Sequence, residues 1–527
     1  MKYSLFAIIP LILIFTNSFG QVKDINELDK EYLNWYNSDL ETNEMAGASV
    51  DKVYEQLLDG REPEKEVVVA VLDGGVDINH DDLKGMVWIN EDEIPGNGID
   101  DDNNGFIDDI HGWNFLGNAA GENVNLENME YTRVYAQNNP DDPNFEKSKI
   151  LWNTEYEGRK NEKEFLRRFR DLYYKSLQII KDETGVEVES EEDLARVNST
   201  NDRVQASKHW IQQTYNMGLT NEDLDKIMDQ NDKFMKYYLN KTLDSRKIVG
   251  DDPDDITDTN YGNPDVIGPR PDHGTSVSGV IAAVRNNDLG INGVATNVKI
   301  MVIRIVPDGD ERDKDIALGI RYAVDNGADI VNMSFGKQIT THKDWVDEAI
   351  KYADEKGVLL VHAAGNDGFN IDIEDSFPND KFLDGTMPSN FISVGAQHAE
   401  LDKNFPASFS NYGQKQVDLF APGCDIISLD TANCYSQNDG TSVAAPVVTG
   451  VAALILVYFP GITPQEMIGL LMESSYKIKK PKMYLPGDGR KRKKAKFVSM
   501  SKSGGILNAY TAFLLASERY DDKLTLH

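Results

Sequence analysis

The sequence has little basic charge and few cysteines. Its 54 Lys and Arg residues stand against 88 Asp and Glu, which gives a formal net charge of -34 at pH 7. This excess argues against nucleic acid or an anionic membrane as the partner and favours solubility and cation binding. The 2 cysteines allow one disulfide at most, and internal repeats are absent from the sequence.

A signal-like apolar run occurs only at the start of the chain. Residues 1–15 combine a basic start with an apolar core too short for a comfortable membrane span, and Ser18 and Gly20 follow as small residues. The pattern is typical of a secretory signal peptide over residues 1–20, with an uncleaved anchor as the alternative. We therefore expect an exported protein, extracellular or periplasmic, with no stable membrane anchor.

The cysteines lie close together in the sequence. Cys424 and Cys434 enclose a short loop ahead of residues 440–446. In an exported chain such a pair predicts a disulfide, which would contribute roughly 2–3 kcal/mol in the chain-entropy model. Two free buried thiols are the alternative.

Length and hydrophobic content indicate a large globular protein. With 527 residues, 40% of them hydrophobic, the chain is long enough to form one large domain with insertions, or two to three units, and to bury a hydrophobic core. Residues 21–66 are charged and helical in pattern. We interpret them as a structural arm on the following domain, with a short removable pro-segment as the alternative.

Residues 440–446 (GTSVAAP) join a polar loop to an apolar, helix-like run. Ser442 therefore lies at a predicted helix start, beside unpaired backbone N–H groups and the positive end of the helix dipole. That position suits a nucleophile whose attack creates an oxyanion. A lone serine there is more often a helix cap, so the assignment depends on partners elsewhere in the chain.

Two candidate partners occur. A serine hydroxyl needs a histidine as base, and the histidine needs a carboxylate. Asp73 ends the apolar run of residues 66–73, which predicts a buried parallel strand, and functional groups of open α/β sheets collect at such strand ends. His273 opens a helical pattern in residues 271–283. Alone, Asp73 would suit a turn and His273 a structural role.

These stretches resemble the subtilisin-like serine proteases. The blocks VVVAVLDGGVD, HGTSVSG and GTSVAAP contain the acid, histidine and serine in that family's chain order. The resemblance implies Asp73 as the orienting acid, His273 as general base and then acid, and Ser442 as nucleophile. Asn366, which follows a strand pattern, matches the amide that supplies the family's oxyanion donor. No cofactor is expected in catalysis.

The resemblance also implies a substrate site. Residues 333–336 are similar to the extended segment on which the family lays its peptide substrate, which implies backbone pairing from Ser334, Phe335 and Gly336. A plain strand end is the alternative. HGTSVSG and GTSVAAP depart from the family's usual HGTHVAG and GTSMASP, which leaves substrate preference and rate open. Proteins or peptides are the expected substrates.

An acidic loop indicates calcium. Oxygen-bearing side chains alternate around the turn glycine at 105, namely Asp100, Asp102 and Asn104, with Asp108 beyond. This is the first half of a calcium loop. His111 stands where the closing glutamate belongs, so Asp108, Asp109 or water would complete the site. An acidic surface turn is the alternative.

A second calcium site rests on the resemblance. Asp82 and Asn287 match positions of the family's stabilising calcium site, where a carboxylate and an amide bind the ion together with nearby carbonyls. Calcium at either site would stabilise the fold and take no part in the chemistry.

An insertion separates two of the candidate residues. Asp73 and His273 lie 200 residues apart, farther than compact members of the family place them. A mainly helical insertion is therefore predicted over residues 117–262, with capping boxes at 190–193 and 220–223. One apolar face of it would contain Phe165, Phe169, Leu172, Tyr173 and Ile180. We interpret the insertion as a lid or subdomain beside the active site, with a solvated spacer or partner-docking module as the alternative.

Strand and helix patterns alternate after His273. Such alternation predicts an α/β fold, a parallel sheet with helices on both faces. The subtilisin-like domain would comprise residues 67–116 and 263–518, followed by a tail of residues 519–527.

One basic block, RKRKK, occupies residues 490–494. We interpret it as a solvated hairpin or as an intramolecular contact with the acidic body, in preference to a nucleic-acid patch.

Together these patterns predict an exported serine endopeptidase that hydrolyses peptide bonds through a covalent acyl-enzyme. A secreted, non-catalytic, calcium-binding scaffold with a protease fold is the alternative.

Overall fold

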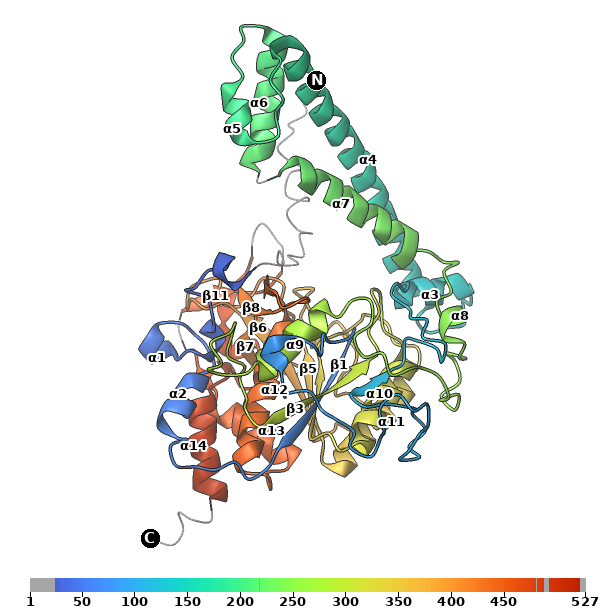
Figure 1. Cartoon of the computed structure of the whole chain (residues 1–527), viewed down its shortest axis with the longest axis vertical. Helices are drawn as coiled ribbons and strands as arrows, with labels where there is room; N and C mark the ends of the chain where they lie inside the picture. Colours follow the sequence, from blue (N-terminus) through green and yellow to red (C-terminus); the bar gives the residue numbers. More distant parts are fainter. Residues whose placement is uncertain (1–23, 218, 480, 488–491, 522–527) are drawn as a thin grey trace. The chain divides into compact units, whose positions relative to one another are not determined.

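The computed structural model describes residues 24–217, 219–479, 481–487 and 492–521 (Figure 1). The chain divides into two compact units. Met1–Asn125 and Ser245–His527 form the first, here called the sheet unit, and Leu126–Asp244 form the second, the helical unit. The predicted signal peptide lies outside the described residues.

The sheet unit is built on a nine-stranded sheet in the order β10-β13-β7-β6-β5-β4-β1-β3-β2. The strands are β1 (Val67–Asp73), β2 (Gly112–Asn114), β3 (Val298–Arg304), β4 (Ile330–Met333), β5 (Leu359–Ala363), β6 (Phe391–Gln397), β7 (Leu419–Pro422), β10 (Tyr476–Lys477) and β13 (Gly505–Ile506). All neighbours pair in parallel except β10, which is antiparallel to β13 at the edge. The predicted parallel sheet is confirmed.

Side chains alternate between the two faces of β1. Val67, Val69 and Val71 enter one core, whereas Ala70 and Leu72 enter another. The first core includes residues of α2 (Val50–Gln56), α9 (Asp272–Ala282), α12 (Thr441–Tyr458), α13 (Pro464–Ser474) and α14 (Ala509–Tyr520). The second includes residues of α10 (Asp313–Asp325) and α11 (Lys343–Lys356). Helices therefore cover both faces, as the α/β pattern predicts.

The central helix α12 is unusually apolar. Its length and hydropathy would suffice to cross a membrane, but 89% of that stretch is buried inside the protein. The helix contacts β1, β4, β5, β6 and β7. We therefore describe it as the core helix of the sheet unit.

The segment before β1 packs into the sheet unit. It contains α1 (Leu40–Asn43) and α2, and the side chains of Trp35 and Tyr36 are buried in the first core. Tyr36 donates from its hydroxyl to the carbonyl of Asn292 at 2.8 Å, and Asn37 donates from Nδ2 to the same carbonyl at 2.7 Å. The arm thus contributes core side chains and specific hydrogen bonds.

The helical unit has its own small core. Its α-helices are α3 (Glu130–Gln137), α4 (Phe145–Thr184), α5 (Glu191–Arg196), α6 (Asp202–Asn216) and α7 (Asn221–Lys233). Phe169, Tyr173 and Ile180 of α4 are buried in that core, as predicted, but Leu172 is 46% exposed, so its assignment to the apolar face was wrong. Capping boxes at Ser190 and Thr220 are confirmed. The unit's boundaries lie inside the predicted residues 117–262, whose ends belong to the sheet unit, including α8 (Arg246–Val249).

Two small hairpins complete the sheet unit, β8 (Ile426–Leu429) with β9 (Tyr435–Asn438), and β11 (Lys482–Tyr484) with β12 (Lys494–Lys496). The first corrects the disulfide prediction, because Cys424 and Cys434 are free. Cys434 lies at the turn, where its carbonyl accepts from the N–H of Asp430, whereas Cys424 precedes β8 at the open end. About six residues of strand, roughly 20 Å, separate these ends, while a disulfide requires Cα atoms about 4–7 Å apart.

Candidate active site

Asp73 and His273 meet at the carboxyl end of the sheet. Asp73 is the last residue of β1, and His273 lies in the first turn of α9. Nδ1 of His273 is 2.8 Å from Oδ2 and 2.9 Å from Oδ1 of Asp73. The close approach requires Gly274, because a Cβ there would lie 2.1 Å from the carbonyl oxygen of Gly75.

The carboxylate fixes the state of the imidazole. A carboxylate only accepts, so Nδ1 of His273 is the donor, and in the neutral ring Nε2 carries the free lone pair. Burial alone would lower the pKa of His273, but the charge and hydrogen bond of Asp73 outweigh it, so the pKa is raised above its ordinary value. This is the arrangement that a general base requires.

Ser442 and Asn366 lie around a common point. A Cβ added to Gly440 would lie 2.7 Å from Oγ of Ser442 and 3.5 Å from Nδ2 of Asn366. Oδ1 of Asn366 accepts from the backbone N–H and the hydroxyl of Thr441, each at 2.9 Å. These bonds orient the amide so that Nδ2 is left as a donor, and they attach it to the first turn of α12, where Ser442 sits.

Helix packing places α9 beside α12. Helices α9 and α12 pack against each other, and both contact β1. No hydrogen bond between His273 and Ser442 occurs among the described residues. In active sites such bonds are often long before substrate binds and shorten in the complex.

The predicted substrate segment follows β4. The side chains of Ser334 and Phe335 are buried, whereas Gly336 is exposed. His362 of β5 lies with Nε2 3.0 Å from the carbonyl oxygen of Phe335, and because a carbonyl only accepts, Nε2–H is the donor. Backbone groups of alternate residues point to opposite sides of an extended segment. The carbonyl of Phe335 is therefore already hydrogen-bonded inside the protein.

A pocket opens beside this segment. His362, Ala364, Ser376 and Asn379 are among its lining residues. A Cβ at Gly336 would lie 3.7 Å from Nε2 of His362 and 3.9 Å from Oγ of Ser376. Sequence reasoning missed His362, although a histidine inside the apolar run of residues 357–366 was the available signal. Its burial lowers the pKa of His362 to about 4, so the ring is neutral near pH 7.

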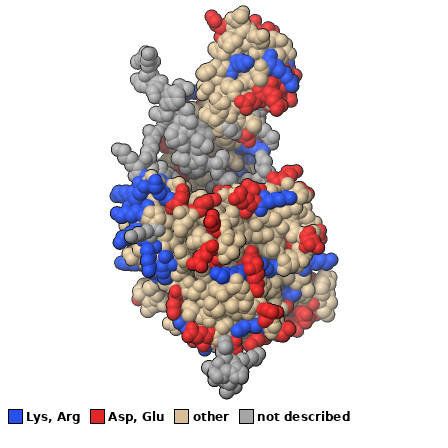
Figure 2. Space-filling view, turned by 90° about the vertical axis from the view of Figure 1, so that its left-hand side faces the viewer, with Lys and Arg blue, Asp and Glu red and all other residues tan. Residues whose placement is uncertain are grey.

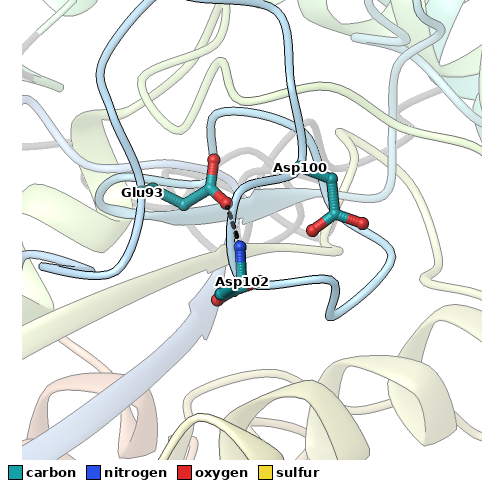
Figure 3. A group of neighbouring side chains, drawn as sticks. All are labelled: Glu93, Asp100 and Asp102. Carbon is teal, nitrogen blue, oxygen red and sulfur yellow. Dashed lines mark hydrogen bonds between the residues drawn. The ribbon is translucent and has the colours of Figure 1, made fainter.

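The predicted calcium loop forms an acidic cluster (Figure 3). Carboxylate oxygens of Asp100, Asp102 and Glu93 all lie within 4.8 Å of one another. Nδ2 of Asn104 donates to Asp102 at 3.0 Å, whereas Asp108 turns away to accept from the backbone of residues 97 and 98. Sequence reasoning missed Glu93, whose signal was an acidic residue just ahead of the loop. The donor set is all oxygen, as Ca²⁺ prefers.

Asp82 and Asn287 also come together. Nδ2 of Asn287 donates to Oδ1 of Asp82 at 2.7 Å, and the N–H of Ile291 donates to Oδ2 at 3.2 Å. Protein donors thus satisfy the carboxylate of Asp82. The acidic loop differs in that it brings three carboxylates together among the described residues.

A parallel α/β sheet with an Asp–His pair and a helix-start serine at its carboxyl edge defines a class of serine hydrolase folds. The family comparison is more specific. The model of the subtilase family of peptidases matches residues 64–502, and the chain belongs to this family. The resemblance seen in the sequence is confirmed.

Several relatives match part of the chain. The thermophilic serine proteinase of Bacillus sp. (strain AK1) is 39% identical over 221 residues, 41% of this chain and 49% of the relative. Thermitase of Thermoactinomyces vulgaris is 37% identical over 184 residues, 35% of this chain and 60% of the relative. A solved cold-adapted subtilisin-like serine proteinase is 28% identical, with a TM-score of 0.36. The match covers 48% of this chain and 79% of the solved chain. The chain spans about half the length of the curated relatives it matches.

Proposed function

We propose that this chain is an exported serine endopeptidase in which Asp73, His273 and Ser442 form the catalytic triad. The bond between His273 and Asp73 is the observation that carries the proposal. It orients the imidazole, selects the tautomer with a free Nε2 lone pair and raises the imidazole pKa.

The reaction would be acyl transfer. Nε2 of His273 takes the proton of Ser442 as Oγ attacks the peptide carbonyl, and Nδ2 of Asn366 donates to the oxyanion that forms. His273 then gives the proton to the leaving amine, the C–N bond breaks, and an acyl-enzyme remains. His273 then takes a proton from water as the water oxygen attacks the ester, the bond from the acyl carbon to Oγ breaks to leave a carboxylic acid, and His273 returns the proton to Oγ of Ser442.

Substrate would bind as an added strand. Backbone groups of Ser334 and Gly336 would pair with an extended peptide, which supports a preference for unfolded or flexible protein segments. The sequence predicted backbone pairing from Ser334, Phe335 and Gly336. We now limit it to Ser334 and Gly336, because the carbonyl of Phe335 already accepts a hydrogen bond from His362.

Export and calcium complete the proposal. The apolar start of the chain supports a cleaved signal peptide and an extracellular or periplasmic location.

The burial of Trp35 and Tyr36 supports an arm that stays attached after maturation, because its removal would expose the core it covers. Glu93, Asp100 and Asp102 would bind a structural calcium ion, with no part in the chemistry.

Cleavage profiling of the purified protein beside its Ser442→Ala form tests the function. We expect the wild type to generate new N-termini from a mixture of unfolded proteins and to react with a fluorophosphonate probe, and Ser442→Ala to do neither. Absence of both signals in the folded, calcium-supplied wild type would support the non-catalytic scaffold instead.

A further inference from the structure

The β11–β12 hairpin presents a basic face. Lys482 pairs with Lys496 across the strands, and Tyr484 pairs with Lys494. Between Lys482 and Tyr484, Met483 is fully buried on the opposite face. Because strand side chains alternate, the three lysines and the tyrosine share the outward face.

In the part of the chain that the structure describes, no acidic side chain pairs with the positive charges of this region. No ion pair to an acidic side chain occurs among its described residues, which are Lys477, Lys479, Lys482, Arg492, Lys493, Lys494 and Lys496. The lysines of this set are all exposed. In Figure 2, which views the side where β11 lies in Figure 1, blue side chains gather at one edge of the sheet unit while red ones are spread over the rest. Residues 490 and 491 of the basic block lie outside the described residues, and for residues 492–494 the solvated hairpin is the interpretation that fits.

The arrangement is locally unfavourable. Like charges directly opposite each other destabilise an antiparallel pair, and Lys482 and Lys496 occupy such positions. In a chain with a net charge of -34, acidic partners for these lysines are abundant in composition. Arrangements that disfavour the local structure, such as facing like charges, occur most often at functional sites. We therefore expect an external anion to bind these lysines.

The hairpin adjoins the candidate active site. The N–H of Gly487, in the loop after β11, donates to the carbonyl of Ser408 at 2.7 Å. A Cβ at Gly368 would lie 2.8 Å from Cα of Gly487, and Gly368 is two residues beyond Asn366. The basic face therefore belongs to a hairpin packed on the loop that carries the proposed oxyanion donor.

We propose that this basic face is an exosite that binds acidic segments of the polypeptide substrate. The inference rests on the proposed function and adds a substrate class to it. A short acidic segment matches a local patch, whereas an extended polyanion would run onto the acidic body within a few Debye lengths of about 8–10 Å. The ring of Tyr484 is covered by Lys494 and Arg492, with cation-to-centroid distances of 4.5 and 5.3 Å, so it is not free for base stacking.

The test compares two peptides that share one cleavable sequence found by profiling. Each carries extensions of about ten residues on both sides, long enough to span roughly 30 Å, and these are rich in Asp and Glu in one peptide and in Ser and Gln in the other. At low salt we expect KM for the acidic peptide to be at least about fivefold lower, since several exposed ion pairs each contribute modestly. The advantage should vanish at high salt.

Charge reversal locates the effect. In the Lys482→Glu/Lys496→Glu double variant the acidic peptide should lose its advantage, while kcat/KM for the neutral peptide stays unchanged and reports a folded enzyme. The matched control is Lys84→Glu/Lys356→Glu, which makes the same charge change at exposed positions near the amino ends of β3 and β5, whereas the candidate active site lies at the carboxyl ends of the strands. It should keep the advantage.

Each outcome decides between the alternatives. Equal KM values for both peptides at low salt, or an advantage that survives the hairpin variant, would overturn the exosite while leaving the protease proposal intact. Wild-type binding to anionic vesicles or duplex DNA without a preference for the acidic peptide would also overturn it. Failure to cleave either peptide would count against the proposed function itself.

Discussion

Ser334 donates a hydrogen bond from Oγ to the backbone carbonyl of Ser442 at 2.7 Å. Behind it, Nδ2 of Asn332 donates to Oγ of Ser334 at 2.9 Å, and Oδ1 of Asn332 accepts from Thr449 of α12 at 2.8 Å. The proposed substrate segment and the proposed nucleophile are thus joined by one buried network. A shift of either would move the other.

Replacing Ser334 by alanine should therefore lower kcat more than it raises KM. A buried hydrogen bond of this kind contributes roughly 1 kcal/mol, which corresponds to a loss of about fivefold in kcat/KM. Ser334→Thr keeps a hydroxyl and should recover most of the activity. Steady-state kinetics on a small peptide would check this, and an Ala variant with wild-type kcat would show that the network does not position Ser442.

The pH dependence of activity follows from the His273–Asp73 pair. His273 acts as a base only when neutral, and its pKa is raised above the ordinary 6.5. Activity should consequently increase with pH and reach half its plateau above 6.5 in a kcat/KM profile. Asp73→Asn removes the charge that raises the pKa, so the midpoint should move to lower pH, and kcat should fall by on the order of 10⁴ because the tautomer is no longer selected. An unmoved midpoint would contradict this origin of the shift.

The triad candidates could be predicted because each lies in a local motif that resembles the subtilisin-like family. Asp73 ends a valine-rich strand pattern, and His273 and Ser442 begin helical patterns, so parallel-sheet topology alone brings these positions to one edge. The hydrogen bond between His273 and Asp73 then follows from the complementary groups that meet at that edge.

The position of Glu93 and the separation of the two cysteines depend on tertiary packing, so the sequence did not predict them. Glu93 reaches the acidic loop only after the chain folds back, and it accepts from the backbone N–H groups of Asp101 and Asp108. The hairpin register separates Cys424 from Cys434, although their spacing in the sequence suggested a bond. Sequence distance within a hairpin does not report which residues face each other.

Glu311 gives a prediction for stability. Burial raises the pKa of Glu311 to about 8, although the charge of Lys337 opposes the shift. The folded state therefore holds a proton that the unfolded chain releases near pH 4.5. The stability contributed by this group is present below about pH 4.5 and is lost as pH rises toward about 8.

The variant Glu311→Gln keeps a neutral side chain at every pH. Its free energy of unfolding should therefore decline less than that of the wild type between about pH 5 and 8, in denaturant titrations of the inactive Ser442→Ala background. Glu374→Gln, at an exposed position, is the control and should keep the wild-type slope. Parallel curves for Glu311→Gln and wild type would contradict the raised pKa.

Calcium should raise the thermal stability of the protein through Glu93. A ligand that binds only the folded state stabilises it by about 2.7 kcal/mol at a hundredfold excess over Kd, an increase of several degrees in Tm. Glu93 also accepts three backbone hydrogen bonds, so Glu93→Gln will lower Tm even without calcium. The informative quantity is therefore the rise in Tm between chelator and millimolar calcium, which should be largely lost in Glu93→Gln. Asp92→Asn removes the same charge from the exposed neighbouring residue and should keep the full rise. An equal rise in both variants would place any bound calcium elsewhere.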